Sequence, residues 1–163
     1  SGPIEIKDSY GLKIIHVKSA LEMLEAVKEN LSWADIIIKA AAVGDYRAKN
    51  FSAQKIKRGN RNDLTIELAQ NPDIAAETGK LKREDQILIG FAAETENLIE
   101  NAREKMKRKN LDFILANDVS GGNSGFASDT NALKLISRHE NKDIKTYSGL
   151  KEDIAFGIFD DIL

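Results

Sequence analysis

Apolar and polar residues follow one another along the chain in patterns that predict both strands and helices. Short apolar runs bounded by polar residues are typical of strands buried on both faces of a parallel sheet. Three such runs lie at 35–42, 86–91 and 111–116. Strict alternation at 64–68 predicts a strand with one covered face, and two weaker strands at 132–137 and 144–147 are expected to form a hairpin.

Helices are predicted where apolar residues recur three or four positions apart or where a helix-start signal occurs. They are expected over 20–30, 71–79, 96–109 and 149–163. Ser19 and Glu22 have the spacing of a capping box at the start of the first helix. Asn71 and Pro72 predict the start of the second, with Asn71 as N-cap and Pro72 in the first turn.

Strands that alternate with helices indicate an α/β fold: a doubly wound, mainly parallel sheet, Rossmann-like, with a small antiparallel hairpin. The length of 163 residues fits a single domain over 1–163. The net charge of −2 gives no overall attraction to nucleic acid, and no apolar run reaches membrane-spanning length. The absence of cysteine excludes disulfides and a cysteine nucleophile, and it fits a cytoplasmic location.

Candidate chemistry begins where the first apolar run ends. The small residues of Ala40–Gly44 leave main-chain groups uncovered at a strand end, which is where open α/β sheets bind their ligands. Asp45 follows, and the basic segment Lys55–Arg58 begins ten residues further on. A bare strand end, one carboxylate and a basic loop together indicate a nucleotide site. A turn-capping aspartate and a solvated loop are the ordinary alternatives.

Two further features suit an anionic ligand. Lys105 and Lys109 lie four apart on one predicted helix, so their ammonium groups project from one face. Lysines at a helix C-terminus also complement the helix dipole, which is a purely structural explanation. The helix start at Asn71 presents free N–H groups that can hold an anion. His16 and His139 are isolated in the sequence, so they indicate neither a metal site nor a Ser-His-Asp triad.

The phosphate-binding motifs of the common nucleotide folds do not occur in this sequence. No GK[ST] motif is present and no GxGxxG follows a predicted strand, which disfavours a Rossmann dehydrogenase. The glycine-rich segment 120–128 opens no clear helix and is expected to be a surface loop. Nucleic-acid binding through the basic segments is disfavoured by the near-neutral charge and by the lack of interleaved aromatic residues.

Six motifs occur in a single order over nearly the whole chain. They are AAAVGDYRA at 40–48, KIKR at 55–58, NPDI at 71–74, GFAAET at 90–95, KNLDFILAND at 109–118 and GFASDTNAL at 125–133. Together they resemble the phosphopantothenate–cysteine ligase domain of the bacterial bifunctional coenzyme A biosynthesis flavoprotein. Each motif is modest alone, but six in this order and spacing are specific.

The resemblance implies a CTP-dependent ligase. In that family the carboxylate of 4′-phosphopantothenate attacks the α-phosphate of CTP, which releases pyrophosphate and gives an acyl-cytidylate. The amine of cysteine then forms the amide and releases CMP. Such chemistry needs positioning and charge neutralisation more than a side-chain nucleophile. By resemblance, Lys55 would act catalytically on the acyl-cytidylate step, Mg²⁺ would accompany CTP, and FMN would belong only to a separate decarboxylase domain.

The resemblance also assigns nucleotide contacts to particular residues. Asp45 would hold the ribose or help to place Mg²⁺, and Phe91 would pack near the cytosine. Lys105 and Lys109 would grip the triphosphate. The complete set of implied nucleotide-binding residues is Lys39, Ala40, Ala41, Asp45, Lys55, Pro72, Asp73, Ile74, Ala75, Phe91, Lys105 and Lys109.

The sequence departs from the family at its beginning. Family members have a preceding βα unit with an Asn that contacts the acyl intermediate, and this sequence starts after that unit. We therefore expect an N-terminally truncated domain, and a catalytically incomplete nucleotide-binding fragment is the alternative reading. The family resemblance further implies a homodimer and, in the full-length protein, fusion to a decarboxylase domain.

Overall fold

The chain forms two compact units. The computed structural model describes residues 1–2, 11–57, 64–94, 96–118, 128–139 and 143–163. The first unit comprises Ser1–Glu29 and Ala41–Ile74, and the second comprises Asn30–Ala40 and Ala75–Leu163. Among the described residues, no helix combines the length and the apolar character needed to cross a bilayer.

Helix α1 covers Ala20–Leu31 and begins in the first unit. The Ser19 hydroxyl accepts a hydrogen bond from the Glu22 N–H at 3.2 Å and donates one to the Glu22 carboxylate at 3.0 Å. The same carboxylate accepts the Lys18 N–H at 2.9 Å, and this bond is the main reason that the pKa of Glu22 is lowered. The predicted helix and its capping residues are confirmed.

A small antiparallel sheet lies in the first unit. Strand β2 (Tyr46–Ala48) pairs with β3 (Leu68–Gln70). The prediction of a strand at 64–68 with one covered face is wrong: only its last residue lies in β3, and Leu64 and Ile66 are 66% and 64% exposed. Alternation in a sequence shows which side chains share a face, but only a second layer can cover that face, and this sheet has two strands.

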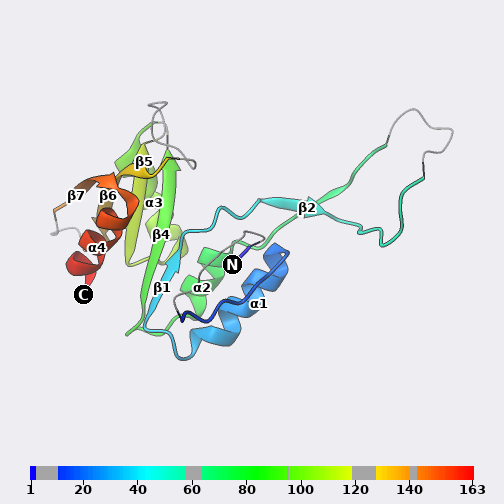
Figure 1. The fold of residues 1–163 in the computed structure, drawn as a ribbon, viewed down its shortest axis with the longest axis horizontal. Coiled ribbons are helices and arrows are strands. Elements are labelled where there is room, and N and C mark those ends of the chain that lie inside the picture. The colour runs from blue at the N-terminus through cyan, green and yellow to red at the C-terminus, as the bar shows by residue number, and fades with distance from the viewer. Residues whose placement is uncertain (3–10, 58–63, 95, 119–127, 140–142) are drawn as a thin grey trace. The chain divides into compact units, whose positions relative to one another are not determined.

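The second unit is built on a five-stranded sheet (Figure 1). Its strands, in spatial order, are β1 (Ile36–Lys39), β4 (Ile87–Glu94), β5 (Phe113–Asp118), β6 (Thr130–Ser137) and β7 (Lys145–Leu150). The β1–β4 and β4–β5 pairs are parallel, whereas β6 is antiparallel to both of its neighbours. The predicted hairpin near the C-terminus is therefore the β6–β7 pair.

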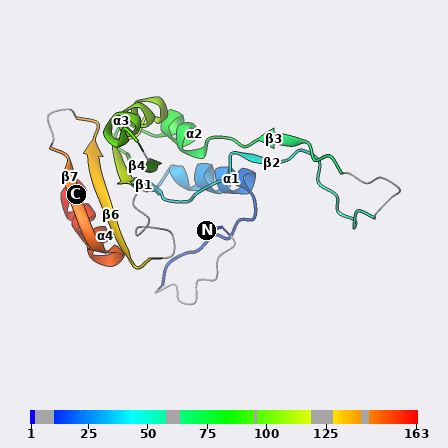
Figure 2. The same cartoon turned by 90° about the horizontal axis from the view of Figure 1, so that it is seen from above.

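Helices cover both faces of this sheet (Figure 2). On one face, Ala102 and Met106 of α3 (Leu98–Lys109) pack against Leu88 and Ile114. The residues that alternate with these point to the other face, where α4 (Lys151–Ile162) packs. The core on that second face consists of Ile89, Phe113, Leu115, Leu133, Leu135, Ile154 and Ile158. The predicted α/β, doubly wound fold is confirmed.

The first apolar run forms an edge strand of the described sheet. Strand β1 covers only Ile36–Lys39 of the predicted 35–42, and within the described residues it pairs with β4 alone. Ile38 is 43% exposed. The prediction that this run is buried on both faces is therefore wrong, because three β-branched residues favour a strand without fixing its place in the sheet.

The last helix also begins later than predicted, because β7 extends through Leu150.

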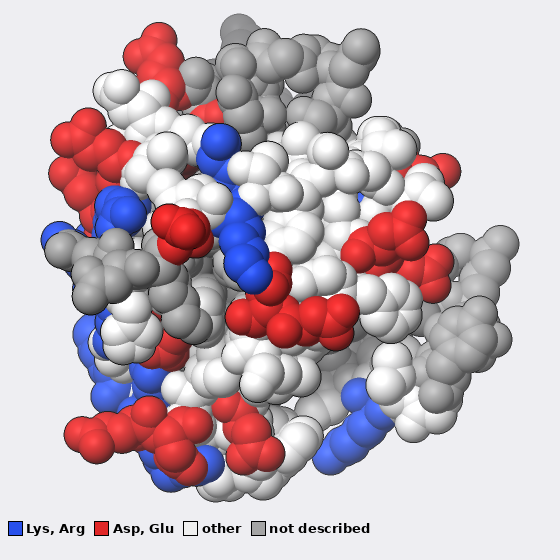
Figure 3. All heavy atoms as spheres, turned by 90° about the vertical axis from the view of Figure 1, so that its left-hand side faces the viewer, with Lys and Arg blue, Asp and Glu red and all other residues white. Residues whose placement is uncertain are grey.

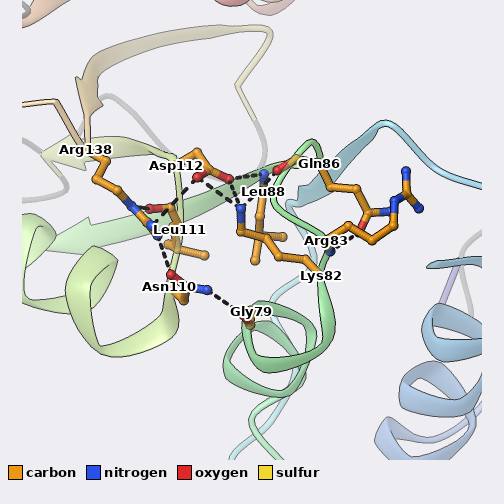
Figure 4. Close-up of polar contacts among 9 residues, drawn as sticks. All are labelled: Gly79, Lys82, Arg83, Gln86, Leu88, Asn110, Leu111, Asp112 and Arg138. Carbon is orange, nitrogen blue, oxygen red and sulfur yellow. Dashed lines mark hydrogen bonds and ion pairs between the residues drawn. The ribbon is translucent and has the colours of Figure 1, made fainter. Parts of the chain in front are cut away.

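A polar network joins the N-terminal ends of β4 and β5 to the segment after α2 (Figure 4). The Lys82 ammonium lies 2.9 Å from the Asp112 carboxylate and donates to the Gln86 carbonyl at 3.0 Å. The Leu88 N–H donates to the same carboxylate at 2.7 Å. The Lys82 side chain is only 6% exposed, so it depends on these partners for the interactions that water would otherwise provide.

Helix α2 (Ile74–Leu81) and the end of α3 meet at a glycine. Asn110 follows α3 in a left-handed conformation, with φ 54° and ψ 42°, and its Nδ2 donates to the Gly79 carbonyl at 2.6 Å. Its Oδ1 accepts a hydrogen bond from Arg138 at 2.8 Å. This contact fixes the C-terminal end of α3, which carries Lys109, against α2 within the second unit (Figure 4).

Candidate functional site

In the second unit, the candidate binding site is the edge of the sheet that is formed by the carboxyl ends of the parallel strands. Strand β1 ends at Lys39, which lies opposite Gly90 of β4. Lys39 is partly buried, and its side chain makes no hydrogen bond or ion pair with any residue that the structure describes. Burial lowers the pKa of the Lys39 ammonium, because a cation withdrawn from water is less well solvated. An anionic ligand at this strand end would provide the ion pair that the Lys39 ammonium lacks among the described residues.

Phe91 lies on the same edge but faces α4. It is partly buried and packs against the core cluster that includes Leu115 and Ile154. Lys105 and Lys109 lie on α3, which covers the opposite face of the sheet. The structure therefore places both lysines on one helix, as predicted, but does not bring them to the face that carries Phe91.

Asn117 is a residue of this edge that the sequence prediction did not single out. It is the penultimate residue of β5, and its Oδ1 is buried without a hydrogen-bond partner in the part of the chain that the structure describes. The sequence pattern that could have pointed to Asn117 is a polar residue directly after a buried apolar run. Ordinary strand ends show the same pattern, so it does not by itself indicate a site. Burial of the acceptor could be recognised only from the folded sheet.

In the first unit, hydrogen bonds bring the segment of Asp45 beside that of Pro72. The Asn71 N–H donates to the Asp45 carbonyl at 2.7 Å, and the Asn71 Nδ2 donates to the Gly44 carbonyl at 2.8 Å. Arg47 donates to the Asn71 Oδ1 at 3.2 Å. Asp45 itself is exposed, so its carboxylate is accessible to a ligand.

The predicted role of Asn71 as an N-cap is wrong. Helix α2 begins at Ile74, three residues after Asn71, and the side chain of Asn71 is engaged with Gly44 and Arg47. The sequence Asn-Pro-Asp matches a helix start, but a tertiary hydrogen bond to Gly44 competes successfully for the Asn amide. Pro72 and Asp73 therefore belong to the approach to the helix rather than to its first turn.

The basic segment lies on the connection between β2 and β3. Lys55 and Lys57 are exposed, and neither forms a hydrogen bond or ion pair within the described residues. Arg58 and most of the glycine-rich segment 120–128 fall outside the described residues. The structure thus leaves Lys55 accessible to a ligand.

The candidate residues divide between the two units. Those of the first unit are Ala41, Asp45, Lys55, Pro72, Asp73 and Ile74, and those of the second are Lys39, Ala40, Ala75, Phe91, Lys105 and Lys109. No group of three or more His, Cys, Asp or Glu residues suited to a metal ion occurs among the residues described. On the face drawn in Figure 3, acidic and basic side chains are interspersed, without a continuous basic surface.

Comparison with known proteins identifies the family. Residues 1–163 match the model of the DNA/pantothenate metabolism flavoprotein C-terminal domain. The chain belongs to this family. It is 46% identical over 137 residues to the coenzyme A biosynthesis bifunctional protein CoaBC of Vibrio cholerae, covering 83% of this chain and 34% of that protein. The chain spans less than half the length of the curated relatives that it matches. The resemblance found from the six motifs is confirmed.

Solved structures agree with this family assignment. The C-terminal domain of a CoaBC protein superposes with a TM-score of 0.74 at 32% identity, covering 99% of this chain and 69% of that chain. A Cab2 mutant in complex with phosphopantothenate-cysteine superposes with a TM-score of 0.65 at 14% identity, covering 90% of this chain and 51% of that chain. The second likeness shows a shared fold.

Proposed function

We propose that this family member joins 4′-phosphopantothenate to cysteine with CTP as the activating nucleotide. The main support is the whole-length family match, together with the likeness to the C-terminal domain of CoaBC. The phosphopantothenate-cysteine bound to the Cab2 structure is chemically the expected product, although that ligand belongs to a distant relative. The proposed activity belongs to coenzyme A biosynthesis, which is the pathway named for the CoaBC relatives.

The reaction has two steps that conserve atoms and charge. The substrate carboxylate attacks the α-phosphorus of CTP, forming an acyl–phosphate bond and releasing pyrophosphate. The cysteine amine then attacks the acyl carbon, CMP leaves, and the amine gives up a proton as the amide forms. Neither step requires a nucleophilic side chain, because the nucleophiles come from the substrates.

The charged residues of the chain suit the first step. Lys55 is exposed on a connecting segment and can approach the phosphate that carries the developing charge. The partly buried ammonium of Lys39 can pair with an anion, while Lys105 and Lys109 offer two further positive charges from α3. Mg²⁺ would enter with the triphosphate, and the exposed carboxylate of Asp45 is the ligand that we propose for it in the first unit.

A homodimer forms part of the same proposal. Large apolar side chains are exposed on and around the β2–β3 sheet, and Phe51 is 90% exposed. Others along this part of the chain are Tyr46, Ile56, Leu64, Ile66 and Leu68. Monomeric proteins rarely leave so many large apolar side chains in water, so a second copy of the chain is the proposed cover. Fusion to an FMN-dependent decarboxylase domain is proposed for the full-length protein.

Lys55→Gln tests the proposed activity, with Lys57→Gln as the matched control from the same exposed segment. The assay supplies 4′-phosphopantothenate, cysteine, CTP and Mg²⁺, and it follows pyrophosphate release and amide formation separately. We expect Lys55→Gln to retain CTP binding, measured by calorimetry, and to lose amide formation. Lys57→Gln should retain both.

The outcomes separate a ligase from a nucleotide-binding module. Nucleotide binding by the unmodified chain without pyrophosphate release would support the incomplete module instead. Equal turnover of the two variants would show that Lys55 has no specific role in the reaction. Absence of both CTP binding and turnover would contradict the proposed function.

A further inference from the structure

The side chain of Asn110 joins the ends of two helices within the second unit (Figure 4). Its Nδ2 donates to the Gly79 carbonyl of α2 at 2.6 Å, and its Oδ1 accepts a hydrogen bond from Arg138 at 2.8 Å. Arg138 is itself anchored, because its Nε donates to the Leu111 carbonyl at 2.8 Å. Exchanging the oxygen and the nitrogen of the amide would set donor against donor and acceptor against acceptor, so the amide has one orientation that satisfies both partners.

The amide of Asn110 is not needed to end α3. Asn110 follows the helix in a left-handed conformation, which asparagine adopts more readily than most residues. Glycine is the usual residue at such a helix end, and it satisfies the main chain without contributing a side chain. Asn97, at the other end of α3, is also left-handed, and its side chain makes no capping hydrogen bond. The bridge from Asn110 to α2 therefore calls for a separate explanation.

The contact lies next to residues that carry the implied nucleotide contacts. An ideal Cβ on Gly79 would lie 2.0 Å from the Lys109 carbonyl oxygen, so the two helices meet there main chain to main chain. Lys105 lies four residues before Lys109 on α3, and Ala75 lies four residues before Gly79 on α2. Each separation is about 6 Å along a helix axis. A shift at this contact would therefore move both lysines relative to Ala75.

We propose that Asn110 is a positioning residue, which ties α3 to α2 and thereby sets where Lys105 and Lys109 lie relative to the nucleotide. A charged group that is already in place loses less conformational freedom when its ligand binds. The effect should be felt by the outer phosphates, which are the groups that the two lysines are proposed to hold. This inference rests on the proposed function, because it assumes that a triphosphate lies against α3.

Calorimetric titration of the full chain with CTP and with CMP in Mg²⁺ tests the inference. Asn110→Gly retains the left-handed main chain and removes the bridge to α2. It should raise the Kd for CTP about fivefold, which corresponds to one hydrogen bond of about 1 kcal/mol. The Kd for CMP should be unchanged, because CMP lacks the outer phosphates.

Asn97→Gly is the matched control. It makes the same replacement at the other left-handed position of α3, where φ is 48° and ψ is 40° and the side chain makes no capping hydrogen bond. The Kd values for CTP and CMP should both be unchanged. Circular dichroism at the titration temperature verifies that each variant is folded.

A combined variant separates positioning from a general structural role. If Asn110 acts through the lysines, Asn110→Gly should weaken CTP binding by less than about twofold in a chain that already carries Lys105→Ala and Lys109→Ala. The full loss in that background would overturn the inference. Equal weakening of CTP and CMP by Asn110→Gly alone, or an unchanged Kd for CTP, would also overturn it.

Gly79→Ala disturbs the same contact from the side of α2. It should show the same selective loss of CTP affinity, which keeps the inference testable if Asn110→Gly does not fold. A folded Gly79→Ala chain that binds both nucleotides like the unmodified chain would overturn the inference.

The inference and the proposed function fail in different ways. If the unmodified chain forms the amide and Asn110→Gly binds CTP equally well, only the positioning role of Asn110 is refuted. If the unmodified chain binds neither nucleotide and forms no amide, the proposed function fails and the inference fails with it.

Discussion

Replacing Gly79 by alanine is expected to destabilise the second unit, although alanine is the better helix former. An ideal Cβ at this position would lie 2.0 Å from the Lys109 carbonyl oxygen and 3.1 Å from the Asn110 Cβ. Real Cβ atoms essentially never approach another heavy atom within 3.0 Å. The obstacle is main chain at the end of α3, which cannot rotate away as a flexible side chain can.

The size of the effect follows from three contributions. Alanine in a helix interior is favoured over glycine by about 1 kcal/mol. Forcing an extra carbon into a close-packed contact costs about 1–3 kcal/mol. Moving α3 away also weakens the 2.6 Å hydrogen bond from Asn110 Nδ2 to the Gly79 carbonyl, worth about 1 kcal/mol. The expected net loss is about 2 kcal/mol, or roughly 4–8 °C in Tm for a chain of this size.

Thermal and urea unfolding followed by circular dichroism measure this loss directly. Gly44→Ala is the control, because the nearest atom to its added Cβ is the Tyr46 carbonyl oxygen at an ordinary 3.7 Å. That change should alter the free energy of unfolding by no more than about 0.5 kcal/mol. If Gly79→Ala has the same Tm as the unmodified chain or a higher one, the close contact between α2 and α3 is refuted.

Three further predictions concern charge. Lys82→Met should lower the free energy of unfolding by about 3 kcal/mol, because it removes the ion-pair partner of Asp112. In urea unfolding, the double variant Lys82→Met, Asp112→Asn should recover part of that loss. Burial raises the pKa of Tyr147 from 10.0 to about 12. The protonated hydroxyl should therefore contribute fully to the free energy of unfolding below pH 10, and this contribution should be lost as pH rises towards 12. Ultraviolet titration should show a late tyrosine ionisation that is absent from Tyr147→Phe. Replacing Lys105 and Lys109 together by alanine should weaken binding of CTP more than binding of CMP in calorimetry, and equal weakening would show that they do not hold the outer phosphates.

Local signals in the sequence were sufficient for most of the secondary structure. The capping pair Ser19 and Glu22 fixes the start of α1, because both partners lie within one helical turn. The helical spacing that includes Ala102 and Met106 predicts the buried side of α3, since a helix projects those positions from one face. The six motifs gave the family, because their order and spacing are properties of the chain itself.

Interactions between distant segments decided what the sequence pattern could not. Ile38 lies in a strand as predicted, but its exposure depends on which strands lie beside β1. Asn71 had the identity of an N-cap, yet its amide bonds Gly44, which is 27 residues away.

The candidate site shows the same division between sequence and structure. The amino-acid sequence by itself determined the helical and strand segments, the charges available for an anionic ligand and the family. Only the tertiary structure decided that Phe91 and Lys105 lie on opposite faces of the sheet and that the acceptor of Asn117 is buried without a described partner. The physical reason is that burial, strand neighbours and hydrogen-bond partners are set by residues far apart in the chain, whereas helical and strand periodicity is set by residues a few positions apart.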